Sequence, residues 1–253
     1  MGKIISFANQ KGGVGKTTSA VNVAASLGIL GYNVLLVDLD PQGNSTSGVG
    51  ISKKSLRFSV QDLLVGGADI HDVIVKTKYH NLSVVPSIIS LAGVEFQLFD
   101  EEDSHIELKN ALLNVKDDFD YIIIDCPPSL GMLTINALSA SDGVIIPMQC
   151  EFYALEGLSQ LMITVSRIKN LYNSKLTVIG ILVTMHNKRL LLSMQVLAEL
   201  NKHYKDKLFK TTISRNVKLS EAPGFGMPVY YHDKSSKGAT EYLEVAKELA
   251  TRI

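Results

Sequence analysis

The residues with the clearest chemistry are glycines and lysines in the stretch 9–18, which reads Asn-Gln-Lys-Gly-Gly-Val-Gly-Lys-Thr-Thr. The apolar run 4–8 before it predicts a buried strand, and apolar residues at helical spacing after it predict a helix. Backbone N–H groups of a glycine-rich loop converge on an anion, and the following helix N-terminus adds positive potential. We therefore expect this loop to bind phosphates, with Lys16 on the β- and γ-phosphates and the Thr17 hydroxyl on Mg²⁺. The expected binding residues are Lys11, Gly12, Gly13, Val14, Gly15, Lys16, Thr17 and Thr18.

A second lysine distinguishes this loop from the ordinary phosphate-loop pattern. That pattern, Gly-x4-Gly-Lys-Ser/Thr, places its first glycine at position 10, where this chain has Gln10 followed by Lys11. The variant Lys-Gly-Gly-Val-Gly-Lys-Thr resembles the deviant Walker A ATPases, the family of ParA/Soj, MinD and the nitrogenase iron protein. The resemblance implies that ATP is the nucleotide and that Lys11 reaches across a dimer to the partner's nucleotide. A glycine turn with two solvated lysines is the alternative, but the spacing, the strand and the helix all favour a phosphate loop.

Carboxylates follow two further apolar runs. The run 34–37 leads into Asp38 and Asp40, and the run 121–124 leads into Asp125. Parallel strands that end in carboxylates direct them toward one site at the carboxyl edge of the sheet. We expect Asp40 to hold the attacking water or to order the metal shell, and Asp125 to bind Mg²⁺ through a water. The competing interpretation is a helix-capping aspartate, and it is stronger for Asp38 than for Asp40.

Longer motifs around these carboxylates extend the resemblance. Asp-x-Asp-Pro-Gln-Gly-Asn at 38–44 and Asp-Cys-Pro-Pro-Ser-Leu-Gly at 125–131 are similar to the two switches of ParA/Soj proteins, which implies that Asp40 is needed for hydrolysis. The loop 214–223 contains Leu-Ser-Glu-Ala-Pro, which is typical of the same branch. In the family this loop lies against the adenine, so Asn216 is the candidate base contact. Many relatives have proline at position 214, where this chain has Ser214.

Strands and helices alternate along the chain, and this alternation predicts one α/β domain over residues 1–253. Its expected core is a doubly wound, mostly parallel sheet with helices on both faces, similar to P-loop NTPases. The polar stretch 45–60 is expected to be a surface excursion. The expected strands are 4–8, 34–37, 82–86, 121–124, 143–147, 177–184 and 209–213. The expected helices are 60–64, 70–75, 90–116, a segment that runs to about 171, 190–204 and 236–252.

Charge is balanced overall but is not evenly distributed. The chain has 25 basic and 25 acidic residues, yet residues 167–218 hold eleven Lys and Arg against Glu199 and Asp206, a net of +9. A segregated basic segment is typical of proteins that bind a polyanion. Solvent-exposed lysines on the outer faces of helices would give the same charge pattern. The resemblance implies DNA contacts at Arg189 and Lys218, and Arg215 is a third candidate because it lies three residues before Lys218. The acidic cluster 100–103 is assigned no site.

Several features favour a cytoplasmic protein, and the resemblance to ParA/Soj implies association with the nucleoid. No stretch of ~18 uncharged apolar residues predicts a membrane span, and the first strand begins too early for a signal peptide. Cys126 and Cys150 fit no disulfide framework or zinc pattern, and we interpret both as buried thiols in a reducing compartment.

The principal hypothesis, carried by the resemblance, is a partitioning ATPase of a chromosome or plasmid. ATP would drive formation of a homodimer, the dimer would bind double-stranded DNA without sequence preference, and a ParB/Spo0J-type partner would trigger hydrolysis. A MinD-like, membrane-associated division-site ATPase is the alternative, but the last helix carries Glu241, Glu244 and Glu248 rather than a basic face. An iron–sulfur reductase is disfavoured because neither cysteine lies in the flanking sequence of that family.

Overall fold

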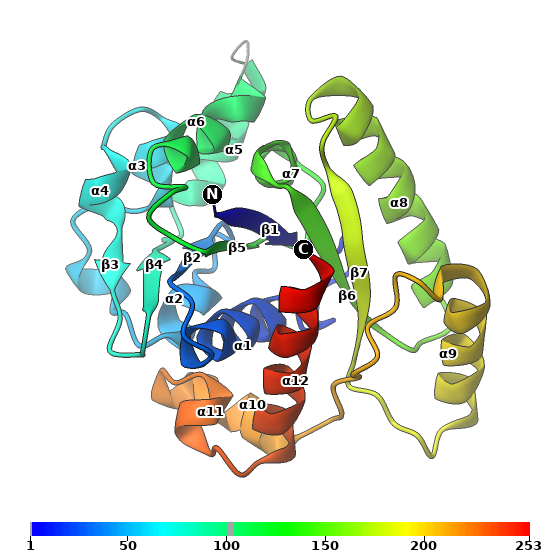
Figure 1. The fold of residues 1–253 in the computed structure, drawn as a ribbon. Helices are drawn as coiled ribbons and strands as arrows, with labels where there is room; N and C mark the ends of the chain where they lie inside the picture. The colour runs from blue at the N-terminus through cyan, green and yellow to red at the C-terminus, as the bar shows by residue number, and fades with distance from the viewer. Residues whose placement is uncertain (1, 101–103) are drawn as a thin grey trace.

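A computed structural model describes residues 2–100 and 104–253 of the chain (Figure 1). The described residues form a seven-stranded sheet of order β3-β4-β2-β5-β1-β6-β7, in which β3 alone is antiparallel to its neighbour. The predicted doubly wound, mostly parallel sheet is confirmed. The strands are β1 (Lys3–Phe7), β2 (Val34–Asp38), β3 (Val75–Lys76), β4 (Leu82–Val85), β5 (Tyr121–Asp125), β6 (Gly143–Gln149) and β7 (Thr177–Thr184).

Helices cover both faces of this sheet, as Figure 1 shows. Helices α1 and α12 pack on one face together with α11, and α3 to α9 cover the other face or its edge. The helices are α1 (Lys16–Ile29), α2 (Asn44–Gly48), α3 (Val60–Leu64), α4 (Ile70–Val73), α5 (Leu91–Asp100), α6 (Glu107–Leu113), α7 (Met132–Ala140), α8 (Ala154–Leu171), α9 (Leu191–Tyr204), α10 (Val217–Glu221), α11 (Val229–His232) and α12 (Lys237–Arg252). Short 3₁₀ turns span Lys53–Ser55, Ser104–Ile106 and Ala222–Phe225.

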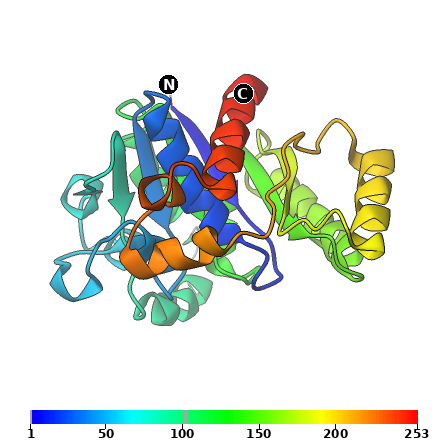
Figure 2. The same cartoon turned by 90° about the horizontal axis from the view of Figure 1, so that it is seen from below.

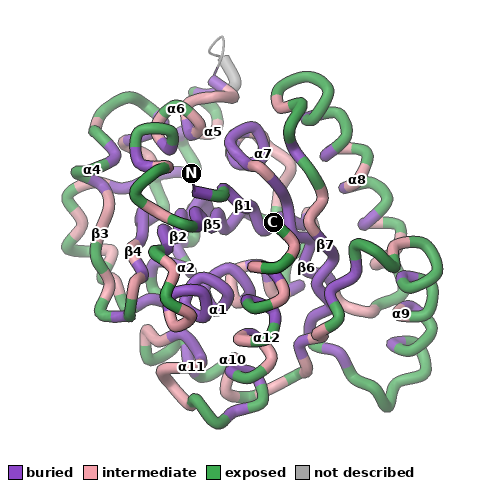
Figure 3. The backbone as a smooth tube through the Cα atoms, viewed as in Figure 1, coloured by how far each residue is buried: buried purple, intermediate pink, exposed green. Residues whose placement is uncertain are grey.

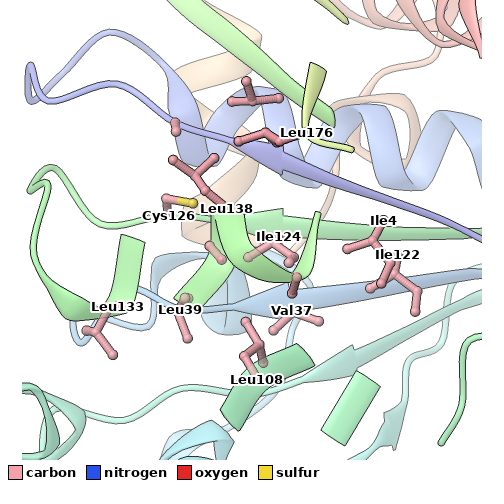
Figure 4. Packing of buried hydrophobic residues seen from close by; sticks show 14 of the residues in the cluster. Ile4, Val37, Leu39, Leu108, Ile122, Ile124, Cys126, Leu133, Leu138 and Leu176 are labelled. Atoms are coloured by element: carbon pink, nitrogen blue, oxygen red, sulfur yellow. The ribbon is translucent and has the colours of Figure 1, made fainter. Parts of the chain in front are cut away.

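Two aliphatic cores explain why the central strands are continuously apolar. Successive side chains of a strand point to opposite faces, so Ile122 and Ile124 of β5 pack in one core and Ile123 packs in the other. Figure 4 shows the first core, where Ile122 and Ile124 lie near Ile4 and Val37. Figure 3 shows buried backbone concentrated in the sheet and in α1 and α7, with exposed residues on the outer helices. The sheet is therefore a rigid base for the loops at its carboxyl edge.

The predicted strand 209–213 is wrong, because its pairing with β7 is interrupted. The segment makes only isolated bridges to the end of β7, with Phe209 N donating to Ile181 O at 3.0 Å and Ile213 N to Val183 O at 2.8 Å. Between these points, the amide of Lys210 donates to the Glu248 carboxylate of α12 at 3.1 Å. The Thr211 amide, which would continue the pairing with β7, also donates to Glu248 at 3.4 Å, so a side chain from the helix replaces the next strand bond.

One other predicted segment differs in the structure. Residues 45–60 do not form a plain surface excursion, because α2 begins at Asn44 and buries Ser45 and Thr46. The helical stretch 90–116, expected to have a junction at the acidic cluster 100–103, consists of α5 and α6, and residues 101–103 lie outside the described residues. No helix in the described ranges is long and apolar enough to cross a membrane.

Helix α12 is fixed at both ends. Near its start, Tyr242 is fully buried and its hydroxyl lies 3.0 Å from Ser19 Oγ of α1. At its end, Arg252 donates to the carbonyls of Ile179 (3.0 Å) and Leu208 (2.6 Å), and its guanidinium lies 4.2 Å from the centre of the Phe209 ring. This arginine therefore joins α12 to the edge of the sheet.

We predict that Arg252→Ala lowers the free energy of unfolding by about 2–3 kcal/mol, because it leaves two carbonyls without a donor and removes the cation–π contact. Urea denaturation followed by circular dichroism measures the change. Lys247→Ala is the control, since Lys247 makes an exposed ion pair with Glu244 and should cost less than about 0.5 kcal/mol. Equal stability of the two variants would contradict the role given to Arg252.

Candidate nucleotide site

The phosphate loop lies between β1 and α1, where the chain connections leave the sheet toward opposite faces. The chain leaves β1 through α1 on one face, and it passes from β5 to β6 through α7 on the other. In doubly wound sheets such a switch point, at the carboxyl ends of the strands, is where ligands bind. Figure 2 shows the loop from below, in dark blue beside the end of α1.

The conformation of the loop requires glycine at two positions. Gly13 has φ 75° and Gly15, the N-cap of α1, has φ 85°, both in the left-handed region. A side chain placed at Gly12 or Gly13 would meet nothing within 4 Å, so this part of the loop borders open space. Thr184 Oγ1 donates to Val14 O at 2.7 Å and holds the loop to the end of β7. The loop is thus shaped for an anion before one arrives.

Lys16 lies across the loop and is 6 % exposed. Its Nζ donates to Lys11 O at 3.1 Å, so the ammonium group lies along the inner side of the loop. Burial lowers the pKa of Lys16, while Asp125, Cys126 and Asp40 act in the opposite direction. A bound phosphate would place negative charge beside this ammonium group and so stabilise its charged form, which burial disfavours.

Lys11 points out of the loop and forms an ion pair with Glu151, which follows β6. Both side chains are about half exposed. The two lysines of the motif are therefore in different settings, with Lys16 buried within its own loop and Lys11 at the surface.

Asp125 is buried beside the loop and keeps one oxygen unused. The strand register pairs Asp125 with Phe7 of β1 and with Asp38 of β2. Its Oδ2 accepts the Ser45 hydroxyl at 2.8 Å, but its Oδ1 has no hydrogen-bond partner among the described residues. Burial, followed by the neighbouring Asp38, raises the pKa of Asp125 above its ordinary value.

These residues fit a magnesium ion. A buried carboxylate oxygen without a donor is costly unless a cation or a cation-bound water meets it. The Thr17 hydroxyl is close enough to lower the pKa of Asp125, although it makes no hydrogen bond of normal geometry to Oδ1. A divalent cation between Thr17 and Asp125 would favour the ionised carboxylate that burial now opposes.

Asp38 and Asp40 differ in their surroundings. Asp38 Oδ2 accepts both the amide and the hydroxyl of Thr46 at 2.7 Å, so this carboxylate holds the start of α2. Asp40 is 8 % exposed, and its Oδ1 accepts the amide of Gln42 at 2.9 Å. Asp40 also influences the pKa of Lys16 and of Asp125, so it lies at the phosphate loop as expected.

Sequence reasoning missed Ser45 and Thr46, which anchor Asp125 and Asp38. The run Asn-Ser-Thr-Ser at 44–47, directly after a strand that ends in carboxylates, is the signal that was available. Serine and threonine hydroxyls at such a position can donate hydrogen bonds to the carboxylates, whereas a loop exposed to solvent has no need of these donors.

A second cavity, of about 230 Å³, adjoins the phosphate loop. Gly15 and Thr18 form one side of it, and Asn216 and Tyr242 form another. Asn216 Oδ1 caps α10 by accepting the amide of Lys218 at 2.8 Å. Within the described chain its Nδ2 has no hydrogen-bond partner, and Asn216 lines the cavity.

The three predicted DNA contacts lie along the same edge. Arg189 is exposed in the loop before α9, and Lys218 is on α10. Arg215 is exposed, and it lines the cavity of Asn216 as well as a neighbouring cavity with Asn187 and Leu190. Figure 2 shows α9 in yellow and α10 in orange, joined by the segment 205–216.

Comparison with known proteins agrees with this site. A family model described as AAA domain matches residues 2–178. The sporulation initiation inhibitor protein Soj of Bacillus subtilis is 54 % identical over 99 % of this chain and 99 % of its own. A plasmid partition protein from Borrelia burgdorferi superposes with a TM-score of 0.80 at 30 % identity, covering 100 % of this chain and 99 % of that one.

A further solved structure carries a different name. Cobyrinic acid a,c-diamide synthase from Mycobacterium smegmatis, with a bound ATP analogue and magnesium, has a TM-score of 0.86 and 36 % identity over 99 % of this chain and 95 % of that chain. The nucleotide and magnesium bound by this neighbour agree with the geometry around Lys16 and Asp125. The sequence motifs, the site and these similarities together show that the chain belongs to the ParA/Soj family of partitioning ATPases.

Proposed function

We propose that this ATPase forms an ATP-bound homodimer that binds double-stranded DNA without sequence preference, and that a ParB/Spo0J-type DNA-binding protein stimulates its hydrolysis. The observation that carries the proposal is that Arg215 lines the cavity beside the phosphate loop and also a neighbouring cavity that includes Leu190, the residue after Arg189. Nucleotide and DNA would therefore meet neighbouring parts of one edge of the sheet. The protein would work in the cytoplasm on the nucleoid.

The residues of the site have distinct tasks in this proposal. The amides of residues 12–18 and the Lys16 ammonium bind the phosphates, and Asn216 contacts the base. Thr17 and Asp125 hold Mg²⁺, which neutralises charge on the β- and γ-phosphates when it is bound. Asp40 orients the water that attacks the γ-phosphorus in line with the leaving ADP oxygen.

Lys11 acts across the dimer. Its ion pair with Glu151 must open before its ammonium group can reach the γ-phosphate of the second nucleotide. There it adds positive charge where negative charge develops during transfer, which is the main electrostatic contribution to such reactions. Phe152 and Tyr153, next to Glu151, are both more than 70 % exposed, so apolar surface is available at this rim for a second subunit.

We predict that Arg189→Glu or Lys218→Glu abolishes DNA retention while ATP-driven dimerisation survives. The logarithm of the DNA-binding constant falls linearly with the logarithm of the salt concentration, and each lost phosphate contact should make this slope shallower by about 0.9. The measurement is a filter-binding salt titration with no nucleotide, with ADP and with ATP, and the parent should bind only with ATP because two basic surfaces must act together.

Lys175→Glu is the matched control for this titration. Lys175 belongs to the same basic segment and is exposed, but it precedes β7 and so lies at the opposite edge of the sheet. It should leave DNA binding near that of the parent. Loss of binding in all three variants would indicate a general charge effect, and binding to anionic vesicles without DNA binding would favour the MinD-like alternative.

A further inference from the structure

One of the three cations assigned to DNA is already paired within the chain. The Lys218 Nζ lies 2.9 Å from Glu221 Oε2, and both residues belong to α10. Their side chains are 43 % and 42 % exposed, so the pair is open to solvent and to a ligand. Arg189 and Arg215 have no carboxylate within 4 Å in the described ranges 2–100 and 104–253. Lys218 is thus distinguished by its partner.

The Glu221 carboxylate is also contacted from a second side. His232 Nε2 of α11 lies 3.5 Å from the same Oε2 atom. The His232 ring is itself stacked on Phe225, with ring centroids 5.1 Å apart. The hydrogen bond that Lys218 donates to Glu221 raises the pKa of Lys218, and the nearby Asp233 acts in the same direction. The local surroundings therefore offer Lys218 negative charge before any DNA arrives.

We propose that Glu221 competes with DNA phosphate for Lys218 and so weakens DNA binding by the ATP-bound dimer. This inference rests on the proposed function, because it takes Lys218 as a phosphate contact. A phosphate oxygen that approaches Lys218 meets an ammonium already shared with a carboxylate, and the carboxylate repels the phosphate. Glu221 thereby keeps the affinity low enough for a dimer to leave DNA readily.

Four variants test the proposal: Glu221→Gln, Lys218→Gln, the double variant and Glu244→Gln. Glutamine at 221 keeps the size of the side chain and removes its charge. Glu244→Gln is the matched control, because Glu244 makes an exposed pair with Lys247 at the same three-residue spacing, 2.8 Å apart, on α12. It changes the net charge equally but leaves Lys218 untouched.

The measurement is fluorescence anisotropy of a labelled duplex with ATP at about 0.15 M salt. Removing an exposed ion pair of this kind should change the DNA affinity by about 3-fold per subunit. Because both subunits of the dimer contact DNA, Glu221→Gln should bind DNA ~10-fold more tightly. Glu244→Gln should stay close to the parent. Lys218→Gln should bind weakly, and the double variant should match it, because the competitor has no effect once the lysine is gone.

The outcomes separate this inference from the proposed function. If Lys218→Gln weakens binding but Glu221→Gln matches the parent, the competition is disproved and the DNA surface stands. If the gain from Glu221→Gln persists without Lys218, or Glu244→Gln shows the same gain, net charge explains it and the inference fails. If Lys218→Gln binds like the parent, Lys218 is no phosphate contact and the inference falls, while Arg189→Glu still reports on the proposed function. Melting temperatures and ATP-dependent sedimentation verify that each variant folds and dimerises.

Discussion

Replacing Lys16 by alanine is expected to weaken ATP binding on the order of 10²- to 10³-fold, because it removes a buried ammonium group from the phosphates. The structure explains the size of this effect. Lys16 is almost fully buried and lies along the inner side of the loop, so neither water nor another described lysine takes its place. Isothermal titration with ATP and Mg²⁺ measures the loss.

Lys11→Ala is the internal control for this experiment. Lys11 is half exposed and paired with Glu151 outside the loop, so its removal should leave ATP binding by the single chain within a few-fold of the parent. The variant should lose ATP-driven dimerisation and hydrolysis. Normal ATP turnover by Lys11→Ala would overturn the assignment of a deviant Walker A motif.

The second large effect is expected at Asp40. Asp40→Ala should bind ATP and dimerise but hydrolyse ATP ~10²-fold more slowly or worse, because the attacking water loses the group that positions it. An ATP-bound dimer should accumulate. Turnover is measured by phosphate release, and the dimer by sedimentation of the same samples.

Asp40→Asn distinguishes this catalytic role from a structural one. An asparagine oxygen can still accept the amide of Gln42, so the local turn at 40–43 is kept while the charge is lost. If Asp40 orients water through its charge, Asp40→Asn should be nearly as slow as Asp40→Ala. Parental turnover in Asp40→Asn would mean that Asp40 only caps the turn.

The central fold was predictable from sequence because the interior strands are covered on both faces. Such strands are continuous apolar runs, and those that end at Asp38 and Asp125 also carry the site. Their carboxylates were placed correctly at one edge because parallel strands share a direction. The loop 9–15 was predictable for a different reason, since left-handed positions at Gly13 and Gly15 restrict the residue type.

The rest depended on contacts between distant parts of the chain. The segment 209–213 has the composition of a strand, but the Glu248 carboxylate of α12 takes an amide that a neighbouring strand would have used. In the same way, the sequence shows Ser45 only as a small polar residue in a polar stretch. The register of β2 and β5 brings it to Asp125. Local patterns cannot show a side chain that competes with the backbone for a hydrogen bond.

The fixing of α12 at both ends has a consequence for handling the protein. Tyr242 of this helix forms part of the wall of the cavity that holds Asn216, and it contacts Ser19 of α1 behind the phosphate loop. A deletion that removes Tyr242 would open this cavity as well as shorten the chain. Fluorescent or affinity tags therefore belong after Ile253, joined by a flexible linker, with the whole helix kept in place.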